Sequence, residues 1–453
     1  MSVLDVDVVL VGMGVGGEWA AERLARAGLS VAGVDDRLVG GECPYWGCVP
    51  SKMMIRAANL LAEGRRIPGM AGHAEVHPDW APVAQRIRDE ATDDWDDKAA
   101  VDRFTAAGGR FFRGQGRITA PAEVTVGDQV LQARRAIVLN TGTEPLVPPI
   151  DGLAGTPYWT NREAIEATEV PDSLVVIGAG AVGVELGQVF ARFGAQVTLV
   201  EGKDHLVPAE EAEACELLEK VFAREGIDVR TGGVATAVRY GGGRFTVELD
   251  GGTKAEGDGL LIATGRRPNL AGIGLGVLGL DEHARAIPVD DHLRVAPGVW
   301  ALGDITGKGG FTHVSMYQAR IAVADILGED VSPAEYHAVP RVTFTDPEIG
   351  SVGLTEPQAR ERGVTVRTGY YPLPKSTRGW IHKVGNDGFI KLVADTDRGV
   401  LVGATSVGPT GGEVLSLLAL AVHARVPVRR LREMIYAYPT FHRAIEAALE
   451  DLG

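Results

Sequence analysis

Hydrophobic and polar positions follow the same order in two stretches, one at the start of the chain and one near its middle. Each opens with an apolar run, VDVVLVG in residues 6–12 and SLVVIG in residues 173–178. A glycine-rich turn, an amphipathic segment and a second apolar run that ends at an acid follow in both. Short apolar runs joined by an amphipathic segment are typical of strand, helix and strand. The pattern predicts two βαβ units.

Both turns have the spacing G-x-G-x-x-G, and in each an acid follows the third glycine by 18 residues. Such a turn lets the backbone approach a pyrophosphate, the following helix start offers N–H groups to the phosphate charge, and the acid can accept hydrogen bonds from a ribose. A single turn could be a plain connector, whereas two copies in full context predict two nucleotide sites. Their residues are Gly12, Gly14, Gly17 and Asp35 in the first, and Gly178, Gly180, Gly183 and Glu201 in the second.

The acid of the second unit bears on the choice of nicotinamide nucleotide. A carboxylate at Glu201 would repel a 2′-phosphate, and the four residues after it include no arginine that would attract one. We therefore favour NAD(H) over NADP(H). If Glu201 only ends a strand, the preference stays open.

The rest of the chain divides at changes of pattern. Residues 139–152 and 261–270 are rich in turn residues and are interpreted as exits from the two units. After about residue 336, β-rich segments alternate with helices without another glycine-rich turn, as in a separate α+β domain. Residues 82–106 predict one polar surface helix. At 453 residues the chain is too long for one core, and the predicted boundaries are 1–148, 149–268, 269–335 and 336–453.

Charge and hydropathy narrow the partners. The net charge of −15 argues against nucleic acids and acidic membranes, whose phosphates would repel the chain. No run of about 18 apolar residues occurs, and the first residues lack the basic region and cleavage site of a signal peptide. We expect a soluble, cytoplasmic protein.

The cysteine count excludes a disulfide scaffold, because the chain has only three. Cys215 lies in a helical pattern, EAEACELLEK, and is interpreted as a packing residue, with a reactive thiol as the alternative.

The other two cysteines, Cys43 and Cys48, lie in the loop GGECPYWGCVPSK at residues 40–52. Pro50 suits the first turn of a helix that starts near Cys48. A thiolate at that helix start would gain from the helix dipole and from Lys52, which should lower its pKa. The loop can bring the two Cα atoms to the roughly 4.4–6.8 Å that a disulfide requires. We favour a redox pair over a metal site, since no second Cys or His pair stands at ligand spacing.

A series of motifs in this order resembles the FAD-dependent pyridine-nucleotide disulfide oxidoreductases, the family of dihydrolipoyl dehydrogenase, glutathione reductase and mercuric reductase. The matching stretches are VVLVGMGVGG, GGECPYWGCVPSK, NTGTEPLVPP, VVIGAGAVGVELG, IATGRRPN, VWALGDITG and FTDPEIGSVGLTE. The resemblance covers essentially the whole chain. It implies an α/β fold of two Rossmann-like domains, for FAD and NAD(H), with a C-terminal α+β domain that forms a homodimer.

The resemblance also assigns roles. Cys48 would lie beside the flavin and Cys43 would exchange with substrate, while Lys52 would lie by the flavin and pair with Glu185. The residues implied for FAD are Gly12, Gly14, Gly17, Asp35, Lys52, Gly116, Thr141, Gly142, Asp304 and Thr312, and those for NAD are Gly178, Gly180, Gly183, Glu201 and Gly265. Electrons would pass between nicotinamide, flavin and the Cys43–Cys48 bridge, and then to or from a small disulfide or dithiol substrate.

The C-terminal segment departs from the family pattern. Family members carry a His before Pro-Thr and a Glu five residues after it, whereas this chain has Tyr438 and Arg443. A phenol can donate a proton at neutral pH but is a poor base. His442 could partly substitute, although a packing or surface role fits it better. Mercuric reductases also place a Tyr there, which favours an alternative function as an NADH-dependent quinone or metal-ion reductase.

Other features weigh against a mercuric reductase. The chain lacks that group's terminal cysteine pairs, which would deliver a soft metal. Tyr45 and Trp46 replace smaller or amide residues of the redox loop, and they form either an aromatic wall for a flat acceptor such as a quinone or simple packing. We therefore place an enzyme resembling dihydrolipoyl dehydrogenase first.

Overall fold

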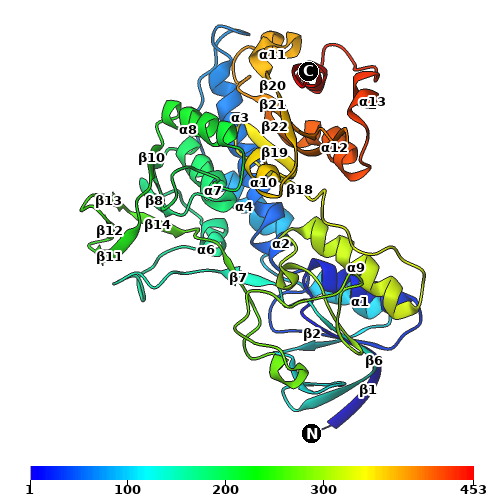
Figure 1. Cartoon of the computed structure of the whole chain (residues 1–453). Helices are drawn as coiled ribbons and strands as arrows, with labels where there is room; N and C mark the ends of the chain where they lie inside the picture. Colours follow the sequence, from blue (N-terminus) through cyan, green and yellow to red (C-terminus); the bar gives the residue numbers. More distant parts are fainter. Residues whose placement is uncertain (1) are drawn as a thin grey trace. The chain divides into compact units, whose positions relative to one another are not determined.

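The computed structural model describes residues 2–453 and divides them into two compact units (Figure 1). The first unit comprises the chain up to Pro50, Gln85–Leu146 and Arg266–Tyr336. The second comprises Ser51–Ala84, Val147–Gly265 and His337–Gly453. The four domain boundaries drawn from the sequence remain a prediction, because this division separates only these two larger bodies.

A mainly parallel sheet forms the centre of the first unit, with the strand order β16-β17-β6-β1-β2-β3 and an antiparallel β4–β5 pair beside β6. The side chains of Val8, Val9 and Leu10 are fully buried, as expected for a parallel strand covered on both faces. The strands are β1 (Ser2–Val11), β2 (Val31–Asp35), β3 (Arg110–Arg113), β4 (Arg117–Ala120), β5 (Glu123–Val126), β6 (Gln129–Leu139), β16 (Arg294–Ala296) and β17 (Val299–Ala301). A short antiparallel pair joins β7 (Thr143–Pro145) to β15 (Arg266–Pro268).

Helices pack on this sheet, and α1 lies against α9. Leu24 of α1 and Ala319 of α9 are fully buried in one apolar core with Leu10. The helices of this part are α1 (Val15–Arg26), α2 (Glu42–Tyr45), α5 (Lys98–Ala106), η2 (Leu275–Leu278), η3 (Asp304–Thr306) and α9 (Thr312–Leu327). Helix α3 (Cys48–Arg66) begins two residues before the first unit ends.

A second parallel sheet, β10-β9-β8-β14, repeats the order β3-β2-β1-β6 around the second glycine-rich turn. The two βαβ units predicted from the sequence are therefore confirmed. The elements are α6 (Asn161–Glu166), β8 (Ser173–Ile177), α7 (Ala181–Arg192), β9 (Gln196–Glu201), α8 (Ala212–Arg224), β10 (Asp228–Thr231) and β14 (Gly259–Ile262), with the antiparallel sheet β11 (Ala235–Gly241), β12 (Arg244–Leu249) and β13 (Lys254–Gly257).

The C-terminal part of the second unit is an antiparallel sheet in the order β18-β19-β22-β21-β20. Leu418 of α12 and Ile445 of α14 are fully buried in one apolar core with Ile390 of β21. The elements are β18 (Pro340–Thr343), β19 (Glu348–Gly353), α10 (Glu356–Glu361), β20 (Val366–Pro372), η4 (Leu373–Lys375), α11 (Thr377–His382), β21 (Phe389–Asp395), β22 (Val400–Gly408), α12 (Gly411–His423), α13 (Val428–Arg432) and α14 (Ala444–Asp451). The predicted fold class is confirmed.

The single helix predicted for residues 82–106 is wrong. The segment forms α4 (Ala81–Arg86), a π-helical turn η1 (Ile87–Ala91), a break at residues 92–97 and then α5. The Thr92 hydroxyl donates to the carbonyl of Ile87, and acids that favour turns and caps follow it. These local bonds compete with a continuous helix.

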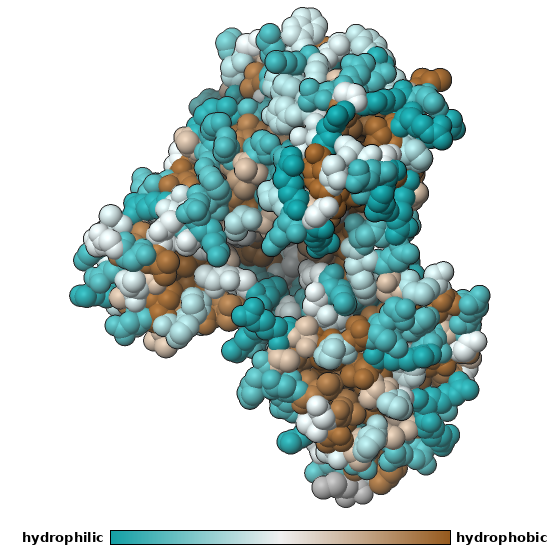
Figure 2. Space-filling model, viewed as in Figure 1, coloured by the Kyte–Doolittle hydropathy of each residue, from teal (hydrophilic) through white to brown (hydrophobic). Residues whose placement is uncertain are grey.

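The surface mixes polar and apolar side chains, and hydrophilic residues cover most of the face shown in Figure 2. Within residues 2–453, no helix is both long and apolar enough to cross a membrane.

Candidate functional site

The first glycine-rich turn shows why its glycines are required. Gly12 has φ +94°, and a Cβ placed on it would lie 2.3 Å from the Asn140 carbonyl oxygen. A Cβ on Gly17 would lie 2.2 Å from the Gly12 carbonyl oxygen. Gly14 caps α1, and no described side chain caps the N–H groups of this helix start. The turn is thus tight, closely packed on its helix, and has backbone donors for a phosphate.

The second turn has the same construction. Gly178 has φ +97°, and its Cβ would lie 2.4 Å from the Ala263 carbonyl oxygen. A Cβ on Gly183 would lie 2.0 Å from the carbonyl oxygen of Gly178. Gly180 is the N-cap of α7, and apart from its chain neighbours no described atom lies within 4 Å of the position a Cβ would take there. This open space at an uncapped helix start fits the close approach of a dinucleotide.

The acid at the end of the second strand braces its turn in both copies. The Asp35 carboxylate accepts from the Met13 N–H at 2.6 Å and the Arg37 N–H at 2.8 Å. Burial raises the pKa of this carboxyl group above its usual range. Glu201 repeats the arrangement, accepting from the N–H groups of Ala179 at 2.7 Å and Lys203 at 2.9 Å. A carboxylate oxygen has a second lone pair, so each acid can still accept from a ribose hydroxyl.

Other residues assigned to FAD lie around the first turn in the first unit. A Cβ on Gly116 would lie 3.0 Å from the Val11 side chain, a tight contact that a glycine avoids. The Thr141 hydroxyl donates to the Asn269 carbonyl at 2.7 Å, and Gly142 follows with φ +64°.

Asp304 opens η3 and accepts from the Thr143 hydroxyl at 2.7 Å, which makes it more than a turn residue. In the second unit, Gly265 has φ +117° and no described atom within 4 Å of a Cβ position. The assignment of these residues to FAD and NAD remains a prediction.

The short helix α2 and the start of the long helix α3 hold the cysteine pair. Cys43 lies in α2 and is half-buried, whereas Cys48 is exposed at the first residue of α3. Both are free thiols in this structure. The Cys48 sulfur lies 3.5 Å from the Thr312 hydroxyl oxygen. A hydrogen bond with Cys48, followed by burial, raises the pKa of the Cys43 thiol. The Cys43 thiol therefore holds its proton more strongly than a free cysteine does.

The ion pair expected between Lys52 and Glu185 is present in the second unit. Lys52 Nζ lies 2.8 Å from Glu185 Oε2, and the ammonium lies 4.6 Å from the centre of the Phe344 ring. The other oxygen of Glu185, which is almost fully buried, accepts from the Phe344 N–H at 2.8 Å. Glu185 is thus fixed by α3 on one side and by the segment after β18 on the other.

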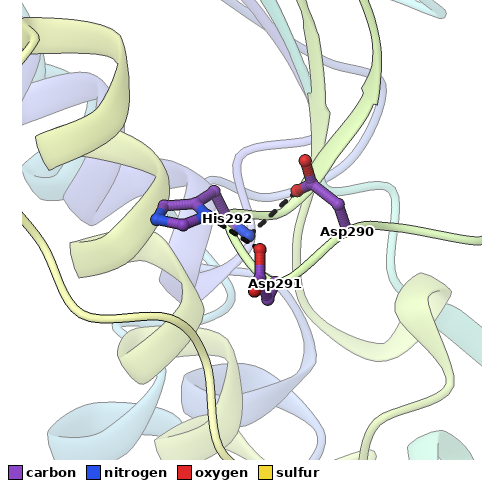
Figure 3. Close-up of side chains that lie close together, drawn as sticks. All are labelled: Asp290, Asp291 and His292. Carbon is purple, nitrogen blue, oxygen red and sulfur yellow. Dashed lines mark hydrogen bonds and ion pairs between the residues drawn. The ribbon is translucent and has the colours of Figure 1, made fainter.

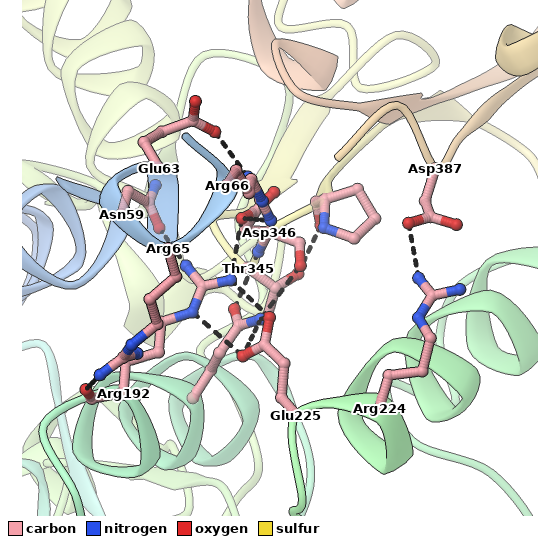
Figure 4. A network of polar contacts seen from close by, with 12 residues as sticks. Asn59, Glu63, Arg65, Arg66, Arg192, Arg224, Glu225, Thr345, Asp346 and Asp387 are labelled. Carbon is pink, nitrogen blue, oxygen red and sulfur yellow. Dashed lines mark hydrogen bonds and ion pairs between the residues drawn. The ribbon is translucent and has the colours of Figure 1, made fainter. Parts of the chain in front are cut away.

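A polar network, missed from the sequence, continues along the same helices (Figure 4). Buried Arg192 makes two bonds to Glu225, one to Asp346 at 2.8 Å and one to the Asn59 side chain. Arg66 also pairs with Asp346. On α7, the two residues with these contacts, Glu185 and Arg192, are separated by seven positions. On α3, the contacting residues are at positions 52, 59 and 66, which are also seven positions from one another. This spacing places one face of each helix against the other, and it was the available signal.

The C-terminal tyrosine lies at the surface. Tyr438 is 65% exposed, and its hydroxyl lies 3.5 Å from the Thr377 hydroxyl. The Arg443 guanidinium lies over its ring at 5.4 Å and pairs with Glu446. His442 is half-buried, with its Nε2 3.5 Å from the Thr440 hydroxyl.

Tyr45 is expected from the sequence either to form an aromatic wall for a flat acceptor or to fill space, and the structure favours packing. Its side chain is 7% exposed, and burial raises the pKa of its phenol to about 12. The ring therefore cannot serve as the exposed wall of an acceptor site. Trp46 is half-buried, with its ring centre 6.0 Å from that of Tyr45.

Other candidate ligands are Cys215 and one group of two acids and a histidine. Cys215 is buried in α8, and burial raises the pKa of its thiol to about 11, as expected for a packing residue. Among the described residues, one group could hold a metal by its geometry: Asp290, Asp291 and His292 (Figure 3). These side chains are mainly exposed, and Asp290 accepts from the backbone of His292 and Arg294, as in an ordinary turn.

Comparisons with known proteins cover both parts of the chain. Residues 6–323 match the family described as pyridine nucleotide-disulphide oxidoreductase, and residues 339–449 match the dimerisation domain of that description. The dihydrolipoyl dehydrogenase of Thermus scotoductus is 32% identical, with 98% of this chain and 97% of the relative covered. The mercuric reductase of Acidithiobacillus ferrooxidans is 31% identical, with 98% and 82% covered.

Solved structures agree with these relatives. LpdA from Mycobacterium tuberculosis superposes with a TM-score of 0.87 at 28% identity, covering 98% of this chain and 99% of that one. The Cu(II) complex of RclA from Escherichia coli, described as an HOCl-induced flavoprotein disulfide reductase, has a TM-score of 0.87 at 25% identity, covering 99% of both chains.

Proposed function

Since the chain belongs to the pyridine nucleotide-disulphide oxidoreductase family, we propose that it moves electrons between NADH and a small disulfide or dithiol substrate through Cys43 and Cys48. The observation that carries this proposal is the pair itself. The two thiols share a hydrogen bond in the unit that also contains the first glycine-rich turn, and Cys48 lies beside Thr312.

The two turns fit the two nucleotides of such an enzyme. The first would hold FAD through the N–H groups at the start of α1, with Asp35 toward a ribose. When bound, FAD supplies two-electron transfer between NADH and the cysteine pair. The second would hold NADH, and the Glu201 carboxylate disfavours the extra phosphate of NADPH.

The cysteines can then act by thiol–disulfide exchange. The Cys43 thiolate attacks one sulfur of the substrate, the substrate S–S bond breaks, and one substrate thiol leaves with a proton. The Cys48 thiolate next attacks the Cys43 sulfur, which closes the Cys43–Cys48 bond and releases the second substrate thiol. Two electrons and two protons have then passed to the substrate, and electrons from NADH restore the dithiol. With a dithiol substrate, the steps run in reverse.

Three further side chains support this chemistry. Glu185 holds Lys52 at one position, so a positive charge can stabilise reduced, anionic groups beside it. Tyr438, in place of the family's His, can donate a proton to the departing thiolate but would deprotonate Cys43 poorly. The raised pKa of Cys43 makes that deprotonation a slow step near neutral pH.

A homodimer fits the surface of the C-terminal part. Ile435 is 96% exposed, Trp380 66% and Leu420 61%, and a second copy of the chain would cover such apolar side chains. Within this dimer, Tyr438 would serve the partner's cysteines. We also propose a cytoplasmic location, where NADH and a reduced thiol pool are both supplied.

A metal-ion or quinone reductase is the second candidate. Tyr438 is the observation that favours it, and two of the proteins similar to this chain are named as a mercuric reductase and as a Cu(II) complex. Closing the Cys43–Cys48 dithiol to a disulfide releases two electrons, enough to reduce one mercuric ion to the metal or two cupric ions to cuprous ions.

An acceptor screen with the FAD-loaded enzyme tests both candidates. NADH oxidation is measured with lipoamide, low-molecular-weight disulfides, quinones, and mercuric and cupric ions. We expect a disulfide to be reduced by the wild type and by Cys215→Ser, but not by Cys43→Ser. Unchanged disulfide turnover in Cys43→Ser refutes the first proposal, and quinone turnover that survives loss of both cysteines supports the second.

A further inference from the structure

The break at residues 92–97 has an unusual backbone. Asp93, Asp94 and Trp95 have φ values of 50°, 54° and 57°, three consecutive left-handed residues without a glycine. L-residues rarely adopt this conformation, and a tryptophan side chain, unlike that of Asn or Asp, cannot accept a local hydrogen bond that would favour it. Hydrogen bonds to side chains must therefore hold the segment. Buried Thr92 provides one of them, because its hydroxyl oxygen accepts from the Trp95 N–H at 3.4 Å.

Two hydrogen bonds join segment 92–97 to the cysteine loop and to the residue just before it. The Asp97 carboxylate accepts from the buried Val39 N–H at 2.7 Å, just before the loop begins. The Trp95 indole N–H donates to the Tyr45 carbonyl at 3.3 Å, at the last residue of α2. All of these residues belong to the first unit. Segment 92–97 thus holds the stretch of chain that contains Cys43.

The orientation of the Asp97 side chain shows that it bonds to distant residues instead of making a hydrogen bond that would stabilise the start of its own helix. Asp97 stands at the N-cap of α5, where an Asp side chain usually accepts from its own helix. Here it makes no such bond within the described residues and turns instead to Val39 and to the Arg113 guanidinium. The local cap is given up for contacts that are 58 and 16 residues away in sequence.

Helix α2 needs such anchors because it is very short. It spans Glu42–Tyr45, and the Trp46 N–H bond to the Glu42 carbonyl at 2.8 Å is the bond that closes it. One turn of helix in isolation is unstable in water. Cys43 must nevertheless return to within disulfide distance of Cys48 after each opening of their bond, which leaves little room for movement.

We propose that Trp95 is a positioning residue for Cys43, which acts by fixing the carbonyl end of α2 through its indole N–H. The inference rests on the proposed function, in which Cys43 and Cys48 alternate between dithiol and disulfide. A loose α2 raises the entropy lost on closing the bond, so Trp95 shifts the equilibrium of the pair toward the disulfide.

The test compares the FAD-loaded wild type with Trp95→Phe, which keeps an aromatic ring and removes the N–H donor. Each enzyme is equilibrated anaerobically with mixtures of reduced and oxidised dithiothreitol, thiols are trapped by alkylation, and the dithiol-to-disulfide ratio is read by mass spectrometry. In this exchange the reagent's disulfide gains the two electrons and two protons that the enzyme thiols lose. We expect Trp95→Phe to favour the dithiol about 2- to 10-fold more, the size expected for one neutral hydrogen bond.

Trp80→Phe is the matched control, because the Trp80 indole N–H also donates to a backbone carbonyl, that of Ala167 at 2.8 Å, in the second unit. Its ratio should equal that of the wild type. Thr92→Val removes the acceptor of the Trp95 N–H while keeping the side-chain shape, and should shift the ratio in the same direction. It is the deciding variant if Trp95→Phe does not fold.

The outcomes separate the two proposals. A wild-type ratio in folded Trp95→Phe, or in Thr92→Val when that variant decides, overturns the role of Trp95 while the pair still cycles. An equal shift in Trp80→Phe also overturns it. A wild type that shows three thiols both before and after reduction by NADH fails the proposed function itself, since oxidation of the pair leaves only the Cys215 thiol.

Discussion

The two glycine-rich turns have the same backbone but different surroundings. A Cβ on Gly16 would lie 2.2 Å from the Ser315 hydroxyl, and one on Gly41 would lie 2.9 Å from the Gly14 Cα atom. Later segments of the chain therefore enclose the first turn. Around Gly180, by contrast, no described atom other than those of its chain neighbours comes within 4 Å of a Cβ position. One motif thus suits both a resident cofactor, which the enclosed turn retains, and an exchanging one, which the open turn admits.

The largest effect, on FAD binding, is expected when a residue next to the first turn is replaced by its counterpart next to the second. Gly16 and Val182 are the second residues of α1 and α7, and Val182 is 38% exposed. Gly16→Val should abolish FAD binding, because the new side chain would displace Ser315 and Leu302. FAD absorbance per protein chain measures this.

The reciprocal change, Val182→Gly, is the control. It should retain full FAD and lower the free energy of unfolding by no more than about 1 kcal/mol, the size of a glycine penalty in a helix. A Gly16→Val enzyme with full FAD content would contradict the enclosure of the first turn.

Disulfide turnover, which uses the cysteines, should depend on pH more strongly than the oxidation of NADH with an acceptor that needs no thiol. The hydrogen bond with Cys48 and burial raise the pKa of Cys43, so its thiolate fraction grows as the pH rises. Disulfide turnover at saturating NADH should increase from pH 7 to 9, by up to about tenfold per pH unit.

Ferricyanide, an acceptor that needs no thiol, provides the control, and its reduction should change much less over the same range. If disulfide turnover stays flat, Cys43 is not the attacking thiol.

Changing the acid of the open turn should affect NADH and leave FAD in place. Glu201→Ala removes an acceptor for the ribose and the hydrogen bond that holds the Ala179 N–H. This change should raise KM for NADH about tenfold and weaken the preference for NADH over NADPH. Steady-state kinetics with both nucleotides measure this. Glu248→Ala, at an acid of β12 in the same unit, should leave KM unchanged. If Glu201→Ala has the same KM for NADH as the wild type, the ribose does not bind at Glu201.

The smallest effect on the fold is expected at Gly180. Its φ of −71° suits alanine, and the added methyl group enters open space. Gly180→Ala should keep Tm within about 1 °C while raising KM for NADH about threefold. Gly178→Ala, with φ +97°, should lower Tm clearly. A large fall in Tm for Gly180→Ala would show that the second turn is also enclosed.

The sequence predicts features that depend on local backbone demands. The glycines of both turns and the acids at Asp35 and Glu201 follow from spacing alone, because a tight turn excludes a Cβ wherever it occurs. The pair of Lys52 with Glu185 came from family resemblance, since 133 residues separate its members.

Features set by distant contacts could not be predicted in this way. The break at residues 92–97 depends on bonds from Trp95 and Asp97 to the cysteine loop, 50 and 58 residues away. The inward direction of Tyr45 depends likewise on its surroundings in the first unit. The Arg192 network did have a signal, the seven-residue spacing on α3 and α7, which a search for motifs overlooks.

The bracing of each turn by its acid has a consequence for how coenzyme preference can change. In the proposed NADH site Glu201 would do two things at once, because the carboxylate that would accept from the ribose also ties Ala179 and Lys203 to the strand end. A mutation that admits NADPH by removing the acid would also untie the turn. An evolutionary or engineered switch therefore needs a short hydroxyl or amide side chain as a replacement acceptor, together with a separate cation for the phosphate, so the path runs through paired rather than single substitutions.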